Sequence, residues 1–460
     1  MAQLAGWLIT IVVMRLLRPV DYGLMNLAEI FMGLSVLVNH LGTIPALIQR
    51  QEIDRPLVRK TFGLVLLSNA AFYLVAFFGA PYFAAFFGEA RLATIVRVLA
   101  LGLIIGAFSA VPSVLLQRDL KFKSISLIEF GAGLAGSALT LVLALEGGGV
   151  WSLVLGNLAT TIFISGALIS VTRFSIAPTF DFSGLGGVFS FGMKVSAARI
   201  MWYFNGNFDG LLVGKILGKH ELGYYSVANT LALMPVTKVM GLTNQIAFAA
   251  YSRIQDDRIK VRNYFLESTS IAFLVFFPIA WGMSAVSSEF VDIVLGPKWN
   301  DVSLVLRIVA LGVPFRALTL LMTPLIDGVG EPGLTLKNTM TTSLIVPAAA
   351  AAGLHWGLVG VCSTSLAGIL LAVGIILRRN LALLDIGYGQ LFSVIFPSML
   401  AAGIMYATVL AARVVLLDTV PPLWRLLLLV LLGALVYGAM TVTFNRGAVL
   451  RSLQLIRGAI

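Results

Sequence analysis

Long apolar runs separated by short polar breaks dominate this chain. In its first part the runs fall near residues 1–17, 23–47, 61–88, 93–116, 124–145 and 150–171. In the remainder they fall near 187–213, 222–247, 264–286, 302–326, 334–354, 356–378, 389–411 and 422–444. A helix needs roughly 20 mainly apolar residues to cross the hydrocarbon core of a bilayer. The pattern predicts an all-α polytopic membrane protein with about fourteen transmembrane helices.

Composition agrees with this class and excludes a water-soluble protein. The 460 residues are 59% hydrophobic and 12% charged, whereas soluble domains carry about 25% charged residues. The net charge of +11 does not indicate nucleic acid, because the basic residues lie between apolar runs and form no patch with interleaved aromatics. Most of them fall in alternate connections, and the positive-inside rule then places both termini in the cytoplasm. One cysteine and three scattered histidines predict no metal site and no cofactor.

The first apolar run is short. About 14 apolar residues precede Arg15, enough for roughly 21 Å of a hydrocarbon core near 30 Å. The segment has no basic n-region and no small-residue cleavage site, so it does not read as a cleavable signal. We expect that the recorded start lies inside the first helix and that the N-terminus is truncated.

An internal repeat spans the two parts of the chain at a spacing near 200 residues. Residues 15–28 align with 215–228, 97–102 with 307–312, and 149–150 with 357–358, always in the same order. The repeat predicts a six-helix bundle in residues 1–180, a second in 181–380, and an extra helix pair with a tail in 381–460. Six is even, so the bundles should be parallel, and transporters of this design bind substrate between their halves.

Two glycine-rich stretches resemble nucleotide-binding motifs. Residues 131–136 match the dinucleotide fingerprint G-x-G-x-x-G, but they lie within an apolar run and lack the preceding strand that the motif requires. Residues 210–215 fall one residue short of a P-loop and lack its Ser or Thr. We predict no ATP site and interpret the first stretch as a helix-packing face of small residues.

Cations within apolar runs are the strongest candidates for function, because each costs about 2.5 to 3.5 kcal/mol on insertion scales and usually faces the bundle interior. The candidates are Arg97, Lys194, Arg199, Lys238, Arg307, Arg316 and Arg425. Three of them, Arg199, Lys238 and Arg316, are the deepest, and we expect them to contact a phosphate or anionic sugar through charge-assisted hydrogen bonds.

The remaining cations admit a plainer interpretation. Arg97 and Arg307 occupy equivalent positions in the two halves, about one turn from the outer end, and either contact substrate or have a structural role. Lys194 and Arg425 lie close enough to helix ends to snorkel.

The apolar runs also contain acids. Glu29 and Asp209 are candidates for ion coupling or for charge pairing, and Asn205 shares a helix face with Asp209 at i, i+4. Glu129 and Glu267 lie near the expected cytoplasmic ends and should meet headgroup water. The chain shows no pair of carboxylates suited to catalysis, and we predict no catalytic residue.

The residues around the first and seventh runs resemble a known family. Residues 15–23, Arg-Leu-Leu-Arg-Pro-Val-Asp-Tyr-Gly, resemble the R-L-L-x-P-x-D/E-Y/F-G signature of polysaccharide repeat-unit flippases. Residues 205–218 and the following Gly-Tyr-Tyr resemble that family's N-x-D-x-x-L-I-G-x-x-L-G stretch, and residues 116–122 are similar to a cytoplasmic loop of its exopolysaccharide and lipopolysaccharide branches. The resemblance covers essentially the whole chain and points to the multidrug, oligosaccharidyl-lipid and polysaccharide exporter superfamily.

This resemblance implies a V-shaped pair of bundles and transport by alternating access. The implied substrate is an undecaprenyl-diphosphate-linked oligosaccharide, moved from the cytoplasmic to the outer leaflet of the bacterial inner membrane for surface polysaccharide biosynthesis. The implied partners are this lipid-linked sugar, membrane lipids, and the polysaccharide polymerase and chain-length proteins.

Two alternatives stay open on the sequence. A cation-coupled multidrug exporter of the same superfamily predicts fewer deep cations and a more acidic cavity. A membrane-embedded glycosyltransferase or polymerase needs a large outer loop or clustered acids and histidines for its chemistry, and the connections here are short.

Overall fold

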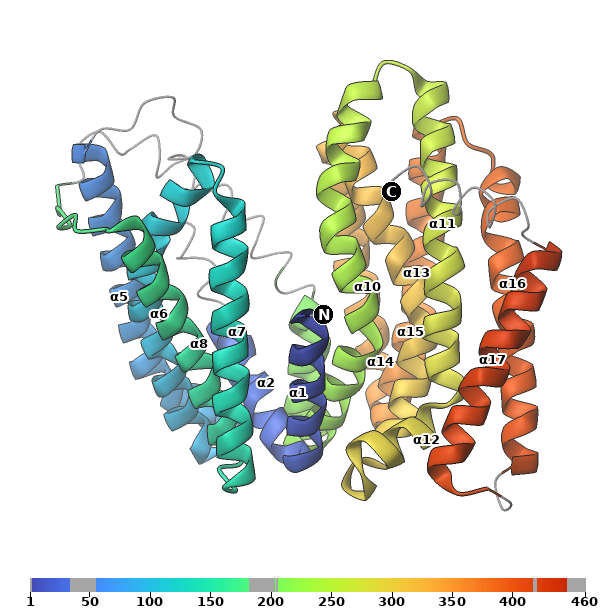
Figure 1. Ribbon diagram of the computed structural model, residues 1–460, viewed down its shortest axis with the longest axis horizontal. Helices are drawn as coiled ribbons and strands as arrows, with labels where there is room; N and C mark the ends of the chain where they lie inside the picture. Colours follow the sequence, from blue (N-terminus) through green and yellow to red (C-terminus); the bar gives the residue numbers. More distant parts are fainter. Residues whose placement is uncertain (1, 34–54, 182–202, 204–205, 417–419, 445–460) are drawn as a thin grey trace. The chain divides into compact units, whose positions relative to one another are not determined.

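The computed structural model describes residues 2–33, 55–181, 203, 206–416 and 420–444 (Figure 1). Every regular element in these residues is helical. The chain forms two compact units, Met1–Gly223 and Tyr224–Ile460. Each unit is described by itself below.

The first unit consists of helices packed against one another. They are α1 (Ala2–Leu16), α2 (Pro19–Gly33), α5 (Arg55–Phe87), α6 (Ala90–Arg118), α7 (Phe122–Leu145), α8 (Val150–Thr172) and the helical residues 206–216. Packing is closest between α5 and α6, α7 and α8, and α6 and α8. The turns after α5 and α7 contain Gly88 and Gly147 at positive φ, a backbone conformation that glycine adopts at low cost.

The second unit contains most of α10, the longest helix described, and the C-terminal pair. Its elements are α10 (Lys219–Ile254), which begins in the last residues of the first unit, α11 (Arg258–Ala285), α12 (Ser287–Phe290), η1 (Val291–Leu295), η2 (Pro297–Trp299), α13 (Val302–Gly328), α14 (Pro332–Gly353), η3 (Leu354–Trp356), α15 (Gly357–Leu383), α16 (Tyr388–Leu416) and α17 (Pro422–Phe444). An aromatic core that includes Phe265, Phe273 and Phe277 joins α11 to its neighbours.

Membrane-spanning length and apolarity confirm the predicted fold class. Among the described residues, nine helical segments are long and apolar enough to cross a bilayer, and one of them, Pro332–Leu383, comprises α14, η3 and α15. The expected second and seventh spans fall partly in residues 34–54 and 182–202, outside the described part. The count of fourteen and the boundaries at 180 and 380 therefore stay predictions.

The predicted repeat reappears as a repeated set of helix contacts. In the first unit α5 packs on α6, α6 on α8, and α7 on α8. In the second unit α11 packs on α13, α13 on α15, and α14 on α15. These are the same three pairings between helices at equivalent places in the two sequence repeats, so the repeat specifies a packing scheme as well as a hydropathy pattern.

Small residues at the α7–α8 contact explain part of the glycine motif at 131–136. A Cβ added to Gly136 would collide with the Thr160 hydroxyl, and one added to Gly156 would collide with the Thr140 hydroxyl. Each threonine hydroxyl donates to the carbonyl oxygen of the glycine one turn before it, at 2.9 Å. A Cβ added to Gly131 or Gly133 would meet no atom of the described residues within 4 Å, so within that part of the chain the packing interpretation holds for Gly136 and is wrong for the other two.

Candidate functional site

The structure describes most, but not all, of the predicted site residues. Arg199 and Asn205 lie outside the described residues, and Lys238 lies on α10 with a side chain that is also outside them. Arg97, Arg307, Arg316, Glu29 and Asp209 are described. The site is therefore built from these five.

Arg316 lies in the middle of α13. It follows Val302 by fourteen residues and precedes Gly328 by twelve, or about 21 and 18 Å at 1.5 Å per residue. Its side chain is half-buried, and its carbonyl oxygen accepts the Thr319 hydroxyl at 2.7 Å. Within the described part of the chain no hydrogen bond, ion pair or ring contact engages the Arg316 guanidinium. An arginine at this depth requires water or an anion beside it.

Arg97 makes its contacts with the protein itself. Its Nε donates to the Phe77 carbonyl oxygen at 3.0 Å, and its guanidinium lies 4.5 Å from the centroid of the Phe77 ring. Both contacts join α6 to α5. A cation held by a carbonyl and an aromatic face is satisfied without a ligand.

Arg307, the repeat equivalent of Arg97, also makes its contacts with the protein itself. Its Nε donates to the Ser287 hydroxyl at 3.4 Å and its Nη2 to the Ser288 hydroxyl at 3.3 Å, joining α13 to α12. The geometry thus separates Arg97 and Arg307, which bind neighbouring helices, from Arg316. For Arg97 and Arg307, contact with substrate stays a prediction.

Glu29 lies on α2 with an exposed side chain. Its carbonyl oxygen and that of Ile30 accept the Tyr203 hydroxyl, at 3.2 and 2.9 Å. No described cation forms an ion pair with the Glu29 carboxylate. The predicted charge pairing is therefore absent among the described residues, and ion coupling stays a prediction.

Asp209 lies in the first turn of the helix 206–216, which packs beside α2. Its Oδ1 accepts the backbone N–H of Gly210 at 2.9 Å. A Cβ on Gly210 would lie 3.3 Å from Ile30 Cδ1, and one on Gly214 would lie 2.8 Å from Leu27 Cδ2. The glycines of the P-loop-like stretch therefore allow residues 206–216 to approach α2 closely, which gives that stretch a packing role.

The signature glycine Gly23 and its repeat equivalent Gly223 lie at one crossing. A Cβ on Gly23 would collide with the Lys219 carbonyl, and a Cβ on Gly223 would collide with the Pro19 carbonyl. The segments Pro19–Gly23 and Lys219–Gly223 therefore touch reciprocally, as two-fold related segments do. All of these residues belong to the first unit.

Two ionic clusters were missed by the sequence reasoning. Lys219 forms an ion pair with Glu89, which precedes α6, and Lys215 lies over the Phe86 ring at 4.1 Å from its centroid. In the second unit Glu289 is 1% exposed and its Oε1 lies 2.7 Å from Arg413 Nε and 3.5 Å from Arg425 Nε. Charges near run ends were the only available signal for either cluster.

Glu289 also corrects the interpretation of Arg425. We expected this side chain to snorkel into headgroup water. Instead its side chain is 13% exposed and lies beside the buried carboxylate. The desolvated carboxylate attracts the guanidinium more strongly than water does.

No described group of His, Cys, Asp and Glu side chains has three members close enough to hold a metal ion. Asp257 is a described ionisable group outside the spans with a perturbed pKa. Asp257 precedes α11, and its carboxylate accepts the backbone N–H of Lys260 at 3.0 Å. This hydrogen bond, with a further one from the Lys260 side chain, lowers the pKa of Asp257.

Solved structures with the same fold are membrane transporters. The structure described as lipid II flippase MurJ in an inward closed conformation superposes with a TM-score of 0.78, covering 97% of this chain and 98% of that one at 14% identity. An inward-facing multidrug resistance transporter of the MATE family superposes with a TM-score of 0.67, covering 84% of this chain and 95% of that one at 18% identity. At these identities the likeness shows the fold alone.

Several curated relatives are named for the biosynthesis or transport of polysaccharides. The lipopolysaccharide biosynthesis protein WzxC of Escherichia coli (strain K12) is 26% identical over 364 residues, 76% of this chain and 72% of that protein. The succinoglycan biosynthesis transport protein ExoT of Rhizobium meliloti (strain 1021) is 24% identical over 322 residues, 69% of this chain and 64% of that protein. The teichuronic acid biosynthesis protein TuaB of Bacillus subtilis (strain 168) is 24% identical, and the match covers 60% of this chain and 57% of that protein.

The family model described as "Polysaccharide biosynthesis protein" matches residues 12–304. This range contains the signature after α1, the crossing at Gly23 and Gly223, and all helices from α2 to α12. It covers more than half of the 460 residues. The chain belongs to this polysaccharide biosynthesis protein family.

Proposed function

We propose that this protein is a flippase that moves undecaprenyl-diphosphate-linked oligosaccharide repeat units from the cytoplasmic to the outer leaflet by alternating access. The observation that carries the proposal is the Arg316 guanidinium, half-buried at the middle of α13 and engaged by no described side chain. In a family of polysaccharide biosynthesis proteins, the substrate that requires such a cation is the diphosphate of a lipid-linked sugar.

Arg316 fits this substrate chemically. A guanidinium presents a planar fork of donors that matches two phosphate oxygens at once. Diphosphate at this depth would otherwise lose its hydration without compensation. The protein breaks and forms no bond: it supplies a polar path for the sugar and the diphosphate, while the polyprenyl chain stays in lipid. It is a transporter and not an enzyme.

The membrane setting follows from the apolar helices and the family. The protein is a multi-pass membrane protein, and we assign it to the inner membrane with both termini in the cytoplasm, supported by the distribution of basic residues. The lipid-linked oligosaccharide and membrane lipids are its substrate and surroundings. We also propose contact with the polysaccharide polymerase and chain-length proteins, because these act on the repeat unit once it has reached the outer leaflet.

A multidrug exporter is the second candidate, and only the shared fold with the MATE structure favours it. Drug cations require anionic partners, whereas the described centre of α13 presents an arginine. Arg316 therefore favours the anionic, phosphate-containing substrate.

Removal of the gene from its host tests this function. We expect a lipid-linked oligosaccharide to accumulate at the cytoplasmic leaflet, where mass spectrometry identifies its sugar, and the surface polysaccharide to disappear. Both changes should reverse when the intact gene is restored. Normal surface polysaccharide without accumulation, in a strain that has no second family member, would exclude the flippase function.

A further inference from the structure

Half-buried polar side chains share one side of α13 with Arg316. Successive residues of an α-helix are turned by about 100° around the axis. Thr323 and Asp327 therefore lie within about 20° of the direction of Arg316, and Thr319 within about 60°. All four side chains are half-buried. Leu320, which is 38% exposed, is the apolar member of this stretch.

The opposite side of α13 is closed by packing. Leu318, Met322 and Leu325 are 3%, 1% and 0% exposed, and they belong to the core that contains Phe273 and Phe277. The less packed side of α13 is thus its polar side. Polar and charged groups in a membrane helix are costly in hydrocarbon and face protein or a watery space instead.

A hydrogen bond shows which side of α14 is turned toward these residues. Thr335 Oγ1 donates to Asp327 Oδ1 at 2.7 Å, so the Thr335 side of α14 is turned toward α13. Thr339 follows one turn later, about 40° around the axis, and its side chain is half-buried. The exposed side chains of Leu336 and Met340 lie about 100° and 140° from Thr335. They give α14 a separate apolar side for lipid.

The residues Thr319, Thr323, Thr335 and Thr339 form what we call the threonine face. Each of their hydroxyl protons is donated within the protein. The hydroxyls at 319, 323 and 339 donate to carbonyl oxygens three or four residues earlier, at 2.7, 3.2 and 3.0 Å, and Thr335 donates to Asp327. A hydroxyl oxygen that has donated its proton still accepts hydrogen bonds through its lone pairs. The threonine face therefore offers acceptors, and a ligand that fits it must donate.

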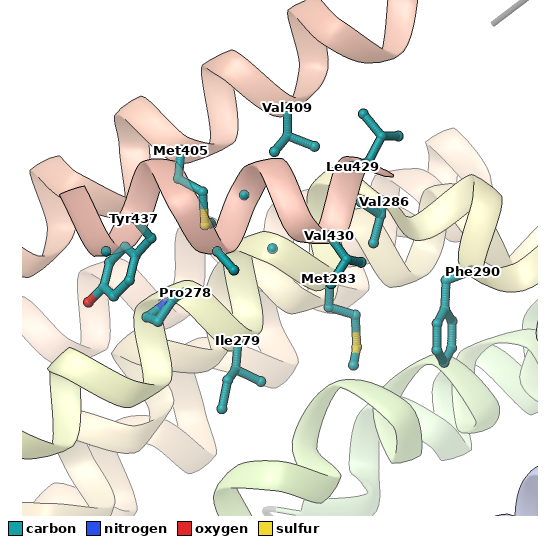
Figure 2. Close-up of a pocket in the computed structure, with 14 residues that line it drawn as sticks. Pro278, Ile279, Met283, Val286, Phe290, Met405, Val409, Leu429, Val430 and Tyr437 are labelled. Atoms are coloured by element: carbon teal, nitrogen blue, oxygen red, sulfur yellow. The ribbon is translucent and has the colours of Figure 1, made fainter. Parts of the chain in front are cut away.

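Two apolar grooves of the second unit do not offer this chemistry. One, of about 460 Å³, has Met405 and Val409 of α16 in its lining (Figure 2). Tyr437 also lines it, and its hydroxyl donates to the Leu274 carbonyl oxygen. The second groove, of about 540 Å³, is lined mainly by aromatic and aliphatic side chains such as Phe277. A sugar in either groove would lose the hydration of its hydroxyls without compensation.

We propose that the threonine face binds the sugar hydroxyls of the lipid-linked oligosaccharide, beside the diphosphate at Arg316. Sugar hydroxyls are hydrogen-bond donors and match the acceptors of this face. Arg316 and Asp327 are eleven residues apart on α13, or about 16 Å at 1.5 Å per residue. The face therefore extends beyond the diphosphate over about half of a hydrocarbon core near 30 Å. The inference rests on the proposed function for the identity of the substrate and adds the side chains that recognise its sugar.

Binding of two probes to the purified full chain tests the threonine face. The first probe is the lipid-linked oligosaccharide extracted from a host strain that lacks the gene, and the second is undecaprenyl diphosphate without sugar. Dissociation constants are measured by native mass spectrometry. The double variant Thr323→Val, Thr339→Val should bind the first probe about 25-fold more weakly, or about fivefold for each lost hydrogen bond. Its affinity for the second probe should not change, whereas Arg316→Ala should weaken both.

Two further variants separate recognition from structure. Thr323→Ser with Thr339→Ser keeps both hydroxyls and should retain the affinity for the oligosaccharide probe. Thr443→Val is the matched control, because the exposed Thr443 of α17 also donates to a carbonyl oxygen four residues earlier, at 2.8 Å, and should bind both probes as the unmodified protein does. Helical circular dichroism checks folding, and a double valine variant that does not fold is replaced by the two single variants.

Unchanged binding of the oligosaccharide probe by the valine variants would overturn the proposal. An equal loss for both probes, or the same loss in Thr443→Val, would also overturn it, because neither result depends on recognition of the sugar by this face. An unmodified protein that binds neither probe would instead contradict the proposed function, and the role of the threonine face would fall with it.

Discussion

Gly23 and Gly223 meet reciprocally: each lies against the backbone of the segment that contains the other, at positions 200 residues apart in the two repeats. A side chain at either position would collide with a carbonyl group, and backbone moves less readily than a flexible side chain. The glycine of the family signature is therefore required by close contact between two chain segments, and this contact gives the first prediction.

Gly23→Ala should destabilise the protein by about 1 to 3 kcal/mol, the usual range for overpacking, or prevent its accumulation. The measurement is apparent Tm of purified protein together with its membrane level. Gly131→Ala is the matched control, since it also places a methyl group on a helical glycine but in open space, and it should be neutral or slightly stabilising. Equal effects of the two changes would mean that the crossing is not tight.

Arg316→Ala should reduce lipid-linked sugar export by at least about tenfold at normal protein level, because it removes a charge-assisted contact to phosphate. Arg316→Lys should retain part of the activity, since a point charge replaces the guanidinium fork. Surface polysaccharide and the lipid-linked intermediate are the readouts. Lys337→Ala, at an exposed position on α14, is the control, and undiminished export by Arg316→Ala would disprove the assignment.

Glu289→Ala should lower the stability of the second unit by about 3 to 5 kcal/mol, because it leaves two mostly buried guanidiniums without their carboxylate. The pair Arg258–Asp385 is the comparison. Its side chains are 72% and 74% exposed, so Asp385→Asn should leave apparent Tm almost unchanged. A similar loss of apparent Tm from both substitutions would show that the burial of Glu289 does not strengthen its ion pairs.

Gly136→Ala should weaken the α7–α8 contact, and Thr160→Ala should partly restore it by removing the hydroxyl that the new methyl group meets. Apparent Tm of both single variants and the double variant forms a double-mutant cycle. Gly133→Ala on the same helix faces open space and should show no coupling to Thr160→Ala. Strictly additive effects at positions 136 and 160 would contradict the contact.

Acid should weaken the start of α11 through Asp257. The backbone N–H of Lys260, and then its side chain, lower the folded-state pKa of Asp257. The contribution of Asp257 to the free energy of unfolding is therefore complete above about pH 4, the unfolded value. That contribution is lost as the pH falls through the lowered folded-state pKa. Asp257→Asn preserves the cap and does not titrate. Between about pH 7 and about pH 3, apparent Tm should fall less in Asp257→Asn than in the unmodified protein.

The sequence alone determined the class of this protein. Apolar runs of membrane-spanning length identify an all-α membrane protein, the repeat anticipates the matching helix pairs, and the signature near Gly23 indicates the family. These conclusions depend on composition and spacing. Both are properties of the sequence itself and do not depend on which segments pack together in the fold.

Only the tertiary structure distinguished Arg316 from Arg97 and Arg307, placed Glu289 between two arginines, and opposed Gly23 to Gly223. A soluble helix shows its buried face as an apolar stripe, but a helix in lipid is apolar on every side. The sequence of such a helix indicates the depth of each residue and not the direction in which its side chain points. The partners of these charges and glycines were therefore decided by helix packing between segments far apart in the chain.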